Sequence, residues 1–373
     1  MILNKKSASY EYLSALCLKG WRIMTQTRSA SPSFANLVLS FSLLISASCS
    51  VKEPEDTTPK PYTCSGAPAT CLQISSGWTF EGIAATFAQS GADPWIIRLD
   101  DGRYRLYQRI SIDEPSAWEG IASWISTSGL SFQQETGYRF QGYTLFQHCI
   151  VRNPDGSYRM YWLDQKQGWV NNIANKAIKS ALSTDGGWTF TLETGERLTY
   201  SGTGYEVNGI VSCRVLLLPN GSFRMYYHAI SDYDRILSAL SPDGLNFTRE
   251  EGVRLDRLCP PETRFGGVTP VIDAHGIVHV FAQAVRCADN YVNPQAGIFE
   301  GTTNDGLVVN IAAVPFVQGY SKDGTTSNSV HPEDFTVVQT TQGLRVYFVL
   351  YGSGSNGIIP ETALYSVINS SIK

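Results

Sequence analysis

The chain has 373 residues, and 29 Lys and Arg against 33 Asp and Glu give a formal net charge of -4. That balance excludes nucleic-acid binding through bulk positive charge, and a charged fraction of 17% argues against a long charged, disordered tail. Aromatic residues make up 12% of the chain, and 33 residues are glycine. This composition predicts an all-β protein with short strands and tight turns.

The first segment predicts export. Residues 37–47 read LVLSFSLLISA, an uncharged run that is too short for a membrane span and fits the core of a secretory signal. Its end, Ser46-Ala47-Ser48-Cys49, resembles a bacterial lipoprotein cleavage site, which implies lipidation of Cys49. An ordinary cleaved signal is the alternative, and translation from Met24 instead of Met1 stays open. We expect residues 1–48 to be a pre-sequence.

Residues 49–73 form the next unit, a polar, proline-containing stretch that predicts an extended tether. Because export permits disulfides, two pairings are predicted from the order of the cysteines. They are Cys64 with Cys71, and Cys259 with Cys287. We interpret Cys149 and Cys213 as buried thiols.

Two phrases then alternate along the chain. The first joins an apolar run, a glycine turn and an aromatic strand, and occurs as IIRLDDGRYRLYQ (96–108), IVRNPDGSYRMYW (150–162), VLLLPNGSFRMYY (215–227), VIDAHGIVHVFAQ (271–283) and VVQTTQGLRVYFV (337–349). The second occurs as ISTSGLSF (125–132), LSTDGGWTF (182–190), LSPDGLNF (240–247) and TTNDGLVV (302–309). Each phrase predicts a β-hairpin, and we expect aromatic residues such as Tyr104, Tyr158 and Phe223 to pack between units.

Two hairpins per unit make a four-stranded antiparallel blade of roughly 60 residues, the dimensions of a propeller blade. The second phrase is one copy short, and ISSGWTF (74–80) at the front supplies the missing copy. Its expected partner is TALYSVINS (362–370). We therefore predict a five-bladed β-propeller over residues 74–373, with a ring closed by pairing of its N- and C-terminal strands, which removes free sheet edges.

The inner strands of the blades place five equivalent residues near one mouth of the ring. These residues stand nine positions before each turn glycine, and they are Asp93, Gln147, Ser212, Gly267 and Asp334. Because the first and last blades are neighbours in a closed ring, we expect Asp93 and Asp334 to approach each other, with Glu333 adjacent. Two nearby carboxylates can divide the roles of base and acid.

The run Ala92-Asp93-Pro94, followed by IIRLDDGRYRLY, resembles the five-bladed furanosidase-type glycoside hydrolases, the superfamily of arabinanases, β-xylosidases and levansucrases. The resemblance covers about residues 74–373 and implies that Asp93 is the catalytic base or nucleophile. The chain departs from the superfamily at two positions. Where the superfamily has an Asp on the second blade, this chain has Gln147 and His148. Where the superfamily has a Glu acid on the third blade, this chain has Ser212 and Cys213. The acid candidates that remain are Asp334, Glu333 and the loop residue Glu206.

The segment Ser183–Phe190, STDGGWTF, is similar to the Asp-box of sialidases. The resemblance implies that Asp185 caps its own turn by accepting backbone N–H bonds, and it marks a fold rather than an activity.

The loops on the expected site face combine aromatic and amide side chains, which suits a glycan groove. The candidate substrate-binding residues are Trp118, Trp169, Tyr233, Tyr291, His148 and Arg286. Packing of the loops is the alternative for each aromatic residue. His148 is a candidate for a central cation or water in the channel, or a plain buried histidine; no other metal or cofactor is expected.

Two functions stay open. One is an exported cell-envelope lipoprotein that processes glycans as a glycoside hydrolase, and the other is a non-catalytic propeller that binds glycan or protein. For both we expect a bacterial envelope location, a monomer, a membrane contact through the lipid anchor alone, and no nucleic-acid partner.

Overall fold

The computed structural model describes residues 71–87, 92–113, 118–164, 176–256, 263–287, 297–321, 329–352 and 363–373. Contacts divide the chain into Met1–Thr58 and Pro59–Lys373, and every described residue belongs to the second unit. The expected signal, Cys49 and most of the tether lie outside the described residues. Within the described ranges, no helix has both the length and the apolar character that a membrane crossing needs.

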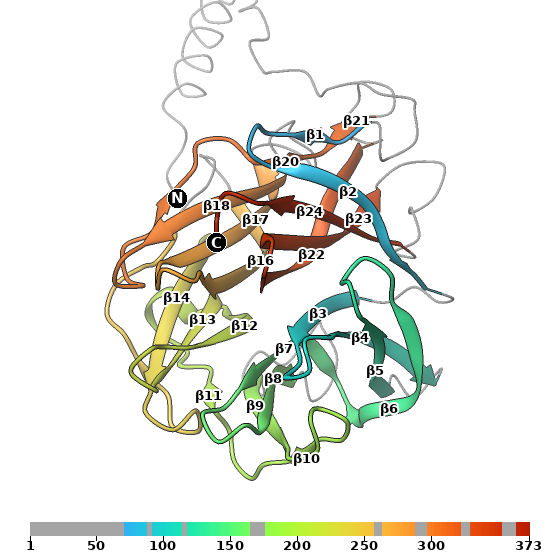
Figure 1. The fold of residues 1–373 in the computed structure, drawn as a ribbon. Coiled ribbons are helices and arrows are strands. Elements are labelled where there is room, and N and C mark those ends of the chain that lie inside the picture. The colour runs from blue at the N-terminus through green and yellow to red at the C-terminus, as the bar shows by residue number, and fades with distance from the viewer. Residues whose placement is uncertain are drawn as a thin grey trace, which may run out of the picture. The chain divides into compact units, whose positions relative to one another are not determined.

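The described residues form five antiparallel sheets in a propeller ring, as predicted (Figure 1). Blade 1 consists of β3 (Ala92–Arg98), β4 (Tyr104–Asp113), β5 (Trp118–Ser126) and β6 (Gln133–Tyr143). Blade 2 consists of β7 (Leu145–Arg152), β8 (Tyr158–Asp164), β9 (Ala177–Ser183) and the short outer strands β10 (Thr191–Leu192) and β11 (Leu198–Thr199). Blade 3 consists of β12 (Gly209–Leu217), β13 (Phe223–Ile230), β14 (Asp234–Ser241) and β15 (Thr248–Arg249), after the 3-10 helix η2 (Gly204–Glu206).

The last two blades also contain strands from the start of the described chain. Blade 4 consists of β16 (Thr263–Ile272), β17 (Val278–Cys287), β18 (Gly297–Thr303), β19 (Asn310–Ile311), β20 (Val317–Gln318) and β1 (Gln73–Ile74). Blade 5 consists of β21 (Tyr320–Ser321), β22 (Ser329–Thr340), β23 (Gly343–Gly352), β24 (Ala363–Asn369) and β2 (Thr79–Thr86).

The N-terminal segment is divided between two blades, which the repeat pattern did not predict. Thr79 of β2 lies opposite Ile368 of β24, within the two segments expected to pair. Ile74, however, pairs with Val317 in blade 4. The reason is Trp78, whose ring stacks on Phe316 of blade 4 with the ring centroids 4.1 Å apart. This contact holds the chain at blade 4 before β2 begins. The broader expectation, that the terminal strands close the ring, stays a prediction.

The innermost strands of the five blades are β3, β7, β12, β16 and β22, and they contact one another in ring order. The second strands are almost wholly buried because neighbouring blades cover both of their faces; every residue of β8, for example, is buried. Tyr104, Tyr158 and Phe223 lie in this core, as expected. The repeated aromatic strands therefore supply the packing between blades.

A recurring contact joins four of the blades to the blade that follows. In blades 1, 2, 3 and 5 a tyrosine on the second strand donates its hydroxyl hydrogen bond to a turn carbonyl of the following blade. The pairs are Tyr107 with Gly187 at 3.0 Å, Tyr161 with Gly244 at 2.8 Å, Tyr226 with Gly306 at 2.9 Å and Tyr347 with Gly129 at 2.9 Å. An arginine two residues earlier binds a glutamate of its own blade in each case. These pairs are Arg105–Glu135, Arg159–Glu193, Arg224–Glu250 and Arg345–Glu81.

The turns that accept these bonds need glycine for two reasons. At Gly187, φ is +78°, which side chains rarely adopt, and an added Cβ would lie 2.2 Å from the Tyr107 hydroxyl. Asp185 holds the same turn by accepting the backbone N–H bonds of Trp188 at 3.0 Å and Thr189 at 2.9 Å, as expected for this residue.

Candidate functional site

The five equivalent inner-strand positions share an irregular backbone. The pairing register of the first strand shifts at this level in every blade, which is the mark of a β-bulge. Asp93, Gln147 and Asp334 are the three non-glycine residues with positive φ in the described ranges, at 58°, 53° and 40°. Left-handed backbone costs free energy at residues with side chains, and such residues cluster at functional sites.

Asp93 is the centre of a polar cluster at these bulges. Its side chain is buried, and its Oδ2 accepts hydrogen bonds from Arg109 Nε at 2.7 Å and from the Gln147 backbone N–H at 3.0 Å. Its Oδ1 is buried without a hydrogen-bond partner among the described residues. Burial raises the pKa of Asp93, but the charges of Arg109 and Arg214 and the hydrogen bond from the Gln147 N–H act together in the opposite direction, and the pKa lies below its ordinary value. The carboxyl is therefore ionised, and its Oδ1 is a buried acceptor without a described partner.

Asp334 lies directly beside Asp93. Its Oδ2 accepts the backbone N–H of Asp93 at 3.2 Å, and its Oδ1 accepts the side-chain amide of Gln147 at 3.0 Å. The structure thus brings together the two aspartates that were expected to meet. Both Asp334 oxygens accept amide hydrogen bonds, so this carboxyl is arranged as an acceptor that orients its neighbours.

Gln147 connects the two aspartates to blade 3. Its side-chain oxygen accepts a hydrogen bond from Arg214 Nη2 at 2.9 Å, and its backbone carbonyl accepts one from Arg214 Nη1 at 2.8 Å. Together with the bonds to Asp93 and Asp334, these contacts use every polar group of Gln147. An amide in place of the expected second aspartate therefore links the inner strands without adding a third negative charge.

Arg109 extends the cluster outward along blade 1. Besides Asp93, its guanidinium binds Glu119, whose other oxygen accepts the backbone N–H of Leu145 at the start of β7. The two carboxylates raise the pKa of Arg109 against the opposing effect of burial. Arg109 is thus a permanent charge that joins the first two blades and fixes the orientation of Asp93.

His148 is fully buried next to this cluster. Burial lowers its pKa to about 3, so its imidazole is neutral at ordinary pH. Among the described residues, no group of three or more His, Cys, Asp and Glu side chains is arranged to hold a metal ion.

The remaining acid candidates differ in their surroundings. Glu206 of η2 is buried in blade 3, where its carboxylate binds Arg249 and accepts the Tyr227 hydroxyl at 2.7 Å. These contacts lower its pKa although burial opposes them. Glu333 instead precedes Asp334 on β22, is partly exposed, and has Oε2 3.6 Å from His331 Nε2.

The expected substrate-binding residues of the loops fall largely outside the described part of the chain. Trp169 and Tyr291 lie outside the described residues, as do the side chains of Trp118 and Arg286. Tyr233 is described, and its ring stacks against the Arg235 guanidinium, 3.7 Å from the ring centroid.

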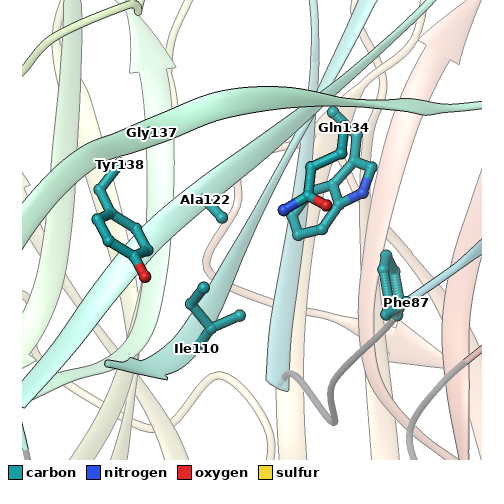
Figure 2. A pocket seen from close by; sticks show the side chains of 7 residues that line it. Phe87, Ile110, Ala122, Gln134, Gly137 and Tyr138 are labelled. Atoms are coloured by element: carbon teal, nitrogen blue, oxygen red, sulfur yellow. The ribbon is translucent and has the colours of Figure 1, made fainter. Parts of the chain in front are cut away.

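A separate pocket of about 420 Å³ lies in blade 1, next to the end of β2 (Figure 2). Its lining residues are Phe87, Ile110, Ala122, Trp124, Gln134, Gly137 and Tyr138. None of the residues predicted for the site lines it, so it is distinct from the Asp93 cluster and has its own aromatic and amide surface.

The roles of three site residues were not predicted from the sequence: Arg109, Gln147 and Arg214. Arg109 was detectable from hairpin register, because it pairs with Ala92 across the turn at Gly102 and so must lie beside Asp93. Arg214 interrupts the apolar run of β12, and a buried arginine requires an acceptor nearby.

Comparison with solved structures identifies propellers of glycoside hydrolases as similar folds. A thermostable family-43 glycoside hydrolase has a TM-score of 0.53 and 14% identity, over 76% of this chain and 91% of that one. A structure from the GH130 family of mannoside phosphorylases, described as containing hydrolases of β-1,2 mannosidic linkages in Candida mannan, has a TM-score of 0.52 and 14% identity, over 85% and 96%. An α-L-arabinofuranosidase from Fusarium graminearum, bound to an iminosugar inhibitor, has a TM-score of 0.51 and 12% identity, over 78% and 98%.

These likenesses are likenesses of fold. No protein-family model and no curated protein sequence matches the chain.

Proposed function

We propose that the protein processes glycans as a glycoside hydrolase, with Asp93 as the base or nucleophile. The observation that carries the proposal is the Asp93 carboxylate, in which Oδ2 is held by Arg109 and the Gln147 N–H while buried Oδ1 has no partner among the described residues. An unsatisfied buried carboxylate oxygen is costly and calls for a functional explanation. A substrate or an attacking water supplies the missing partner.

Glu333 is the acid in this proposal. Asp334 accepts hydrogen bonds on both oxygens, and Glu206 is ion-paired to Arg249, so neither is arranged to carry a proton to a leaving group. Glu333 neighbours Asp334 in sequence and its carboxyl is partly exposed. In a hydrolysis, Glu333 would donate a proton to the glycosidic oxygen while Asp93 attacks the anomeric carbon or deprotonates water.

The location follows from the first segment of the sequence. We place the protein in a bacterial cell envelope, exported and tethered through lipidated Cys49, as a monomer whose site opens at the mouth of the ring. The apolar run at 37–47 and the Ser46-Ala47-Ser48-Cys49 ending support this placement. Envelope glycans or imported oligosaccharides are then the substrates within reach.

Sugar release from a panel of plant, fungal and host glycans tests the proposal, with Asp93→Asn as the inactive variant. We expect turnover of at least one glycan by the wild type and a loss of at least ~100-fold in Asp93→Asn, the usual effect of removing a general base or nucleophile. Asp101→Asn, an exposed aspartate of the same hairpin, is the matched control and retains activity. Equal turnover by the wild type and Asp93→Asn would refute the role of Asp93.

The pocket in Figure 2 favours a second candidate, a non-catalytic glycan-binding propeller. Phe87, Trp124 and Tyr138 offer aromatic faces, and Gln134 offers an amide, which together suit one or two sugar rings. Binding on a glycan array that survives Asp93→Asn and fails in Tyr138→Ala, without any turnover, would favour this candidate over the enzyme.

A further inference from the structure

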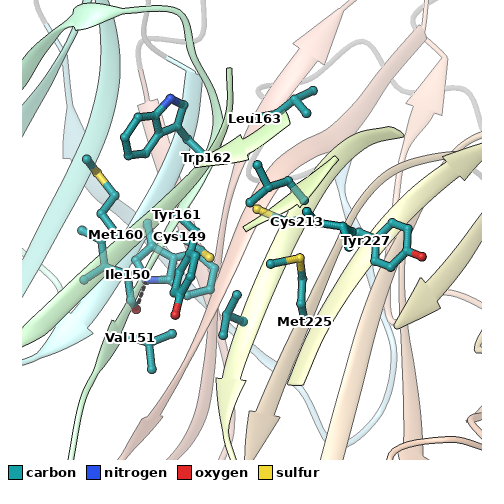
Figure 3. Close-up of a cluster of buried hydrophobic side chains, with 14 of the residues drawn as sticks. Cys149, Ile150, Val151, Met160, Tyr161, Trp162, Leu163, Cys213, Met225 and Tyr227 are labelled. Carbon is teal, nitrogen blue, oxygen red and sulfur yellow. Dashed lines mark hydrogen bonds between the residues drawn. The ribbon is translucent and has the colours of Figure 1, made fainter. Parts of the chain in front are cut away.

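Two buried thiols meet between blades 2 and 3. Cys149 of β7 and Cys213 of β12 both have exposed fractions of 0%, and they lie in one apolar cluster on two strands that contact each other. Figure 3 shows them within the cluster of apolar side chains that the two blades share. Neither takes part in a disulfide in this structure.

Elsewhere the same chain contains an oxidised cysteine. Cys71 is disulfide-bonded, and its predicted partner, Cys64, lies outside the described residues. Disulfides persist where the surroundings are oxidising. Conditions that keep the Cys71 disulfide also favour oxidation of two other thiols that lie on contacting strands within one cluster.

The surroundings make the two thiols unequal. Arg214 lies beside them, and its Nη1 donates to the carbonyls of Cys213 at 3.0 Å and Gln147 at 2.8 Å. Burial raises the pKa of Cys149, but the hydrogen bond from Cys213 and the charge of Arg214 bring it below its ordinary value. The pKa of Cys213 is raised by hydrogen bonding of its thiol to Cys149 and by burial. One thiol is thus prepared to attack first and the other to follow.

We propose that Cys149 and Cys213 form a redox-controlled disulfide that joins blades 2 and 3 behind the Gln147 bulge. The Cys149 thiolate attacks one sulfur of a low-molecular-weight disulfide, RSSR, which forms a mixed disulfide and releases RS⁻. Cys213 then loses its proton and attacks the Cys149 sulfur, which forms the intramolecular bond and releases the second RS⁻. Two electrons pass from the thiol pair to RSSR, and both released thiolates are protonated to RSH.

The bond would act on the strands that carry the site. Gln147 is two residues before Cys149, and Ser212 immediately precedes Cys213, so a covalent link fixes the distance between these two bulges. The buried position indicates that oxidation takes place while the chain folds or when the blades open briefly. This inference is independent of the proposed function, because it needs no substrate.

Refolding of the full chain with oxidised and reduced glutathione, or with dithiothreitol, tests the proposal. After blocking of free thiols and digestion with trypsin, Cys149 lies in the peptide 140–152 and Cys213 in the peptide 198–214. We expect these two peptides to be cross-linked after oxidative refolding and separate after refolding in dithiothreitol. Recovery of both peptides fully alkylated after oxidative refolding would overturn the proposal, and this measurement needs no variant.

Thermal unfolding supplies the second readout. The oxidised form should melt roughly 5–10 °C higher than the reduced form, because the bond closes a long loop. Cys71→Ser should keep the part of this difference that Cys149 and Cys213 cause, whereas Cys213→Ser should lose it. An unchanged redox-dependent difference in Cys213→Ser would assign the effect to another cysteine pair and contradict the proposal.

Discussion

The backbone N–H of Asp93 donates a hydrogen bond to Oδ2 of Asp334 over 3.2 Å, although 241 positions separate the two residues in sequence. The bond crosses from the first blade to the fifth, so it depends on the arrangement of the whole ring. Gln147 of the second blade binds both aspartates and completes a cluster that three blades contribute to. In this cluster one oxygen of Asp93 has no hydrogen-bond partner among the residues that the structure describes.

Replacement of Arg109 by Met should destabilise the protein and raise the pKa of Asp93. Loss of the cation leaves a buried carboxylate without its partner, which costs about 3 kcal/mol of unfolding free energy at neutral pH. In the wild type the depressed pKa of Asp93 contributes stability above the unfolded pKa of about 3.9, and that contribution is lost as pH falls through the folded pKa. As the pH is lowered, the variant should therefore begin to lose stability at a higher pH than the wild type does. Chemical denaturation between pH 3 and pH 7 measures both effects.

The control for that experiment is Arg103→Met, the same substitution in the hairpin of the same blade. Arg103 pairs with Asp101 at the surface, where both side chains are about half exposed, so its loss should change stability little. Equal effects of the two substitutions would show that the buried Arg109 pair contributes no more to stability than the exposed Arg103 pair does.

Alanine at Gly187 should destabilise the protein more than alanine at Gly186. Both glycines have positive φ, at +78° and +76°, so both variants carry a backbone penalty of about 1 kcal/mol. An alanine Cβ at Gly187 also meets the Tyr107 hydroxyl at 2.2 Å, whereas the space at Gly186 is open. The additional loss, on the order of 1–3 kcal/mol, measures the contact between blades 1 and 2. Urea denaturation compares the pair, and equal losses would contradict that role for the contact.

The fourth blade should make stability depend on pH near neutrality. Here His279 occupies the place of the blade arginines, and its ring nitrogens lie 3.2 Å from Glu300 and 3.1 Å from Asp273. Burial lowers the pKa of His279, but these carboxylates outweigh burial and raise it above its ordinary value. Its contribution is therefore fully present below the unfolded pKa of about 6.5 and is lost as pH rises through the folded pKa.

His279→Gln should flatten this decline between about pH 6 and pH 8, because glutamine has no proton to lose. His275→Gln, in the exposed turn of the same hairpin, should leave the pH profile unchanged. Melting temperatures across the range measure the profile, and a decline that persists in His279→Gln would assign it to another group.

Glu206 should prove structural. Its carboxylate joins Arg249 and Tyr227, so Glu206→Gln should lower the unfolding free energy by about 1–3 kcal/mol. At a temperature well below melting, kcat should be nearly unchanged. A large loss of kcat with unaltered melting temperature would instead make Glu206 the acid. Glu333→Gln is the comparison, and we expect it to lower kcat strongly and to leave the melting temperature nearly unchanged.

The sequence predicts the parts of the fold that repeat locally. The five glycine turns and their aromatic strands specify hairpins through residues that are close in sequence, and the constant spacing from each glycine locates Asp93, Gln147 and Asp334 at equivalent bulges. The split of the N-terminal segment was not predictable in this way, because it depends on the packing of Trp78 against blade 4. Arg109 lies beside Asp93 within one hairpin, whereas the link from Arg214 to Gln147 joins neighbouring blades and emerges when the ring is assembled.

A crystal structure of Asp93→Asn with an oligosaccharide that the wild type cleaves tests the central claim most directly. We expect either the anomeric carbon of the sugar or the water that attacks it to lie about 3–3.5 Å from the former Oδ1 position of Asp93, with the Glu333 carboxyl facing the glycosidic oxygen. A sugar bound away from Asp93, for example in the pocket lined by Trp124 and Tyr138, would contradict the account.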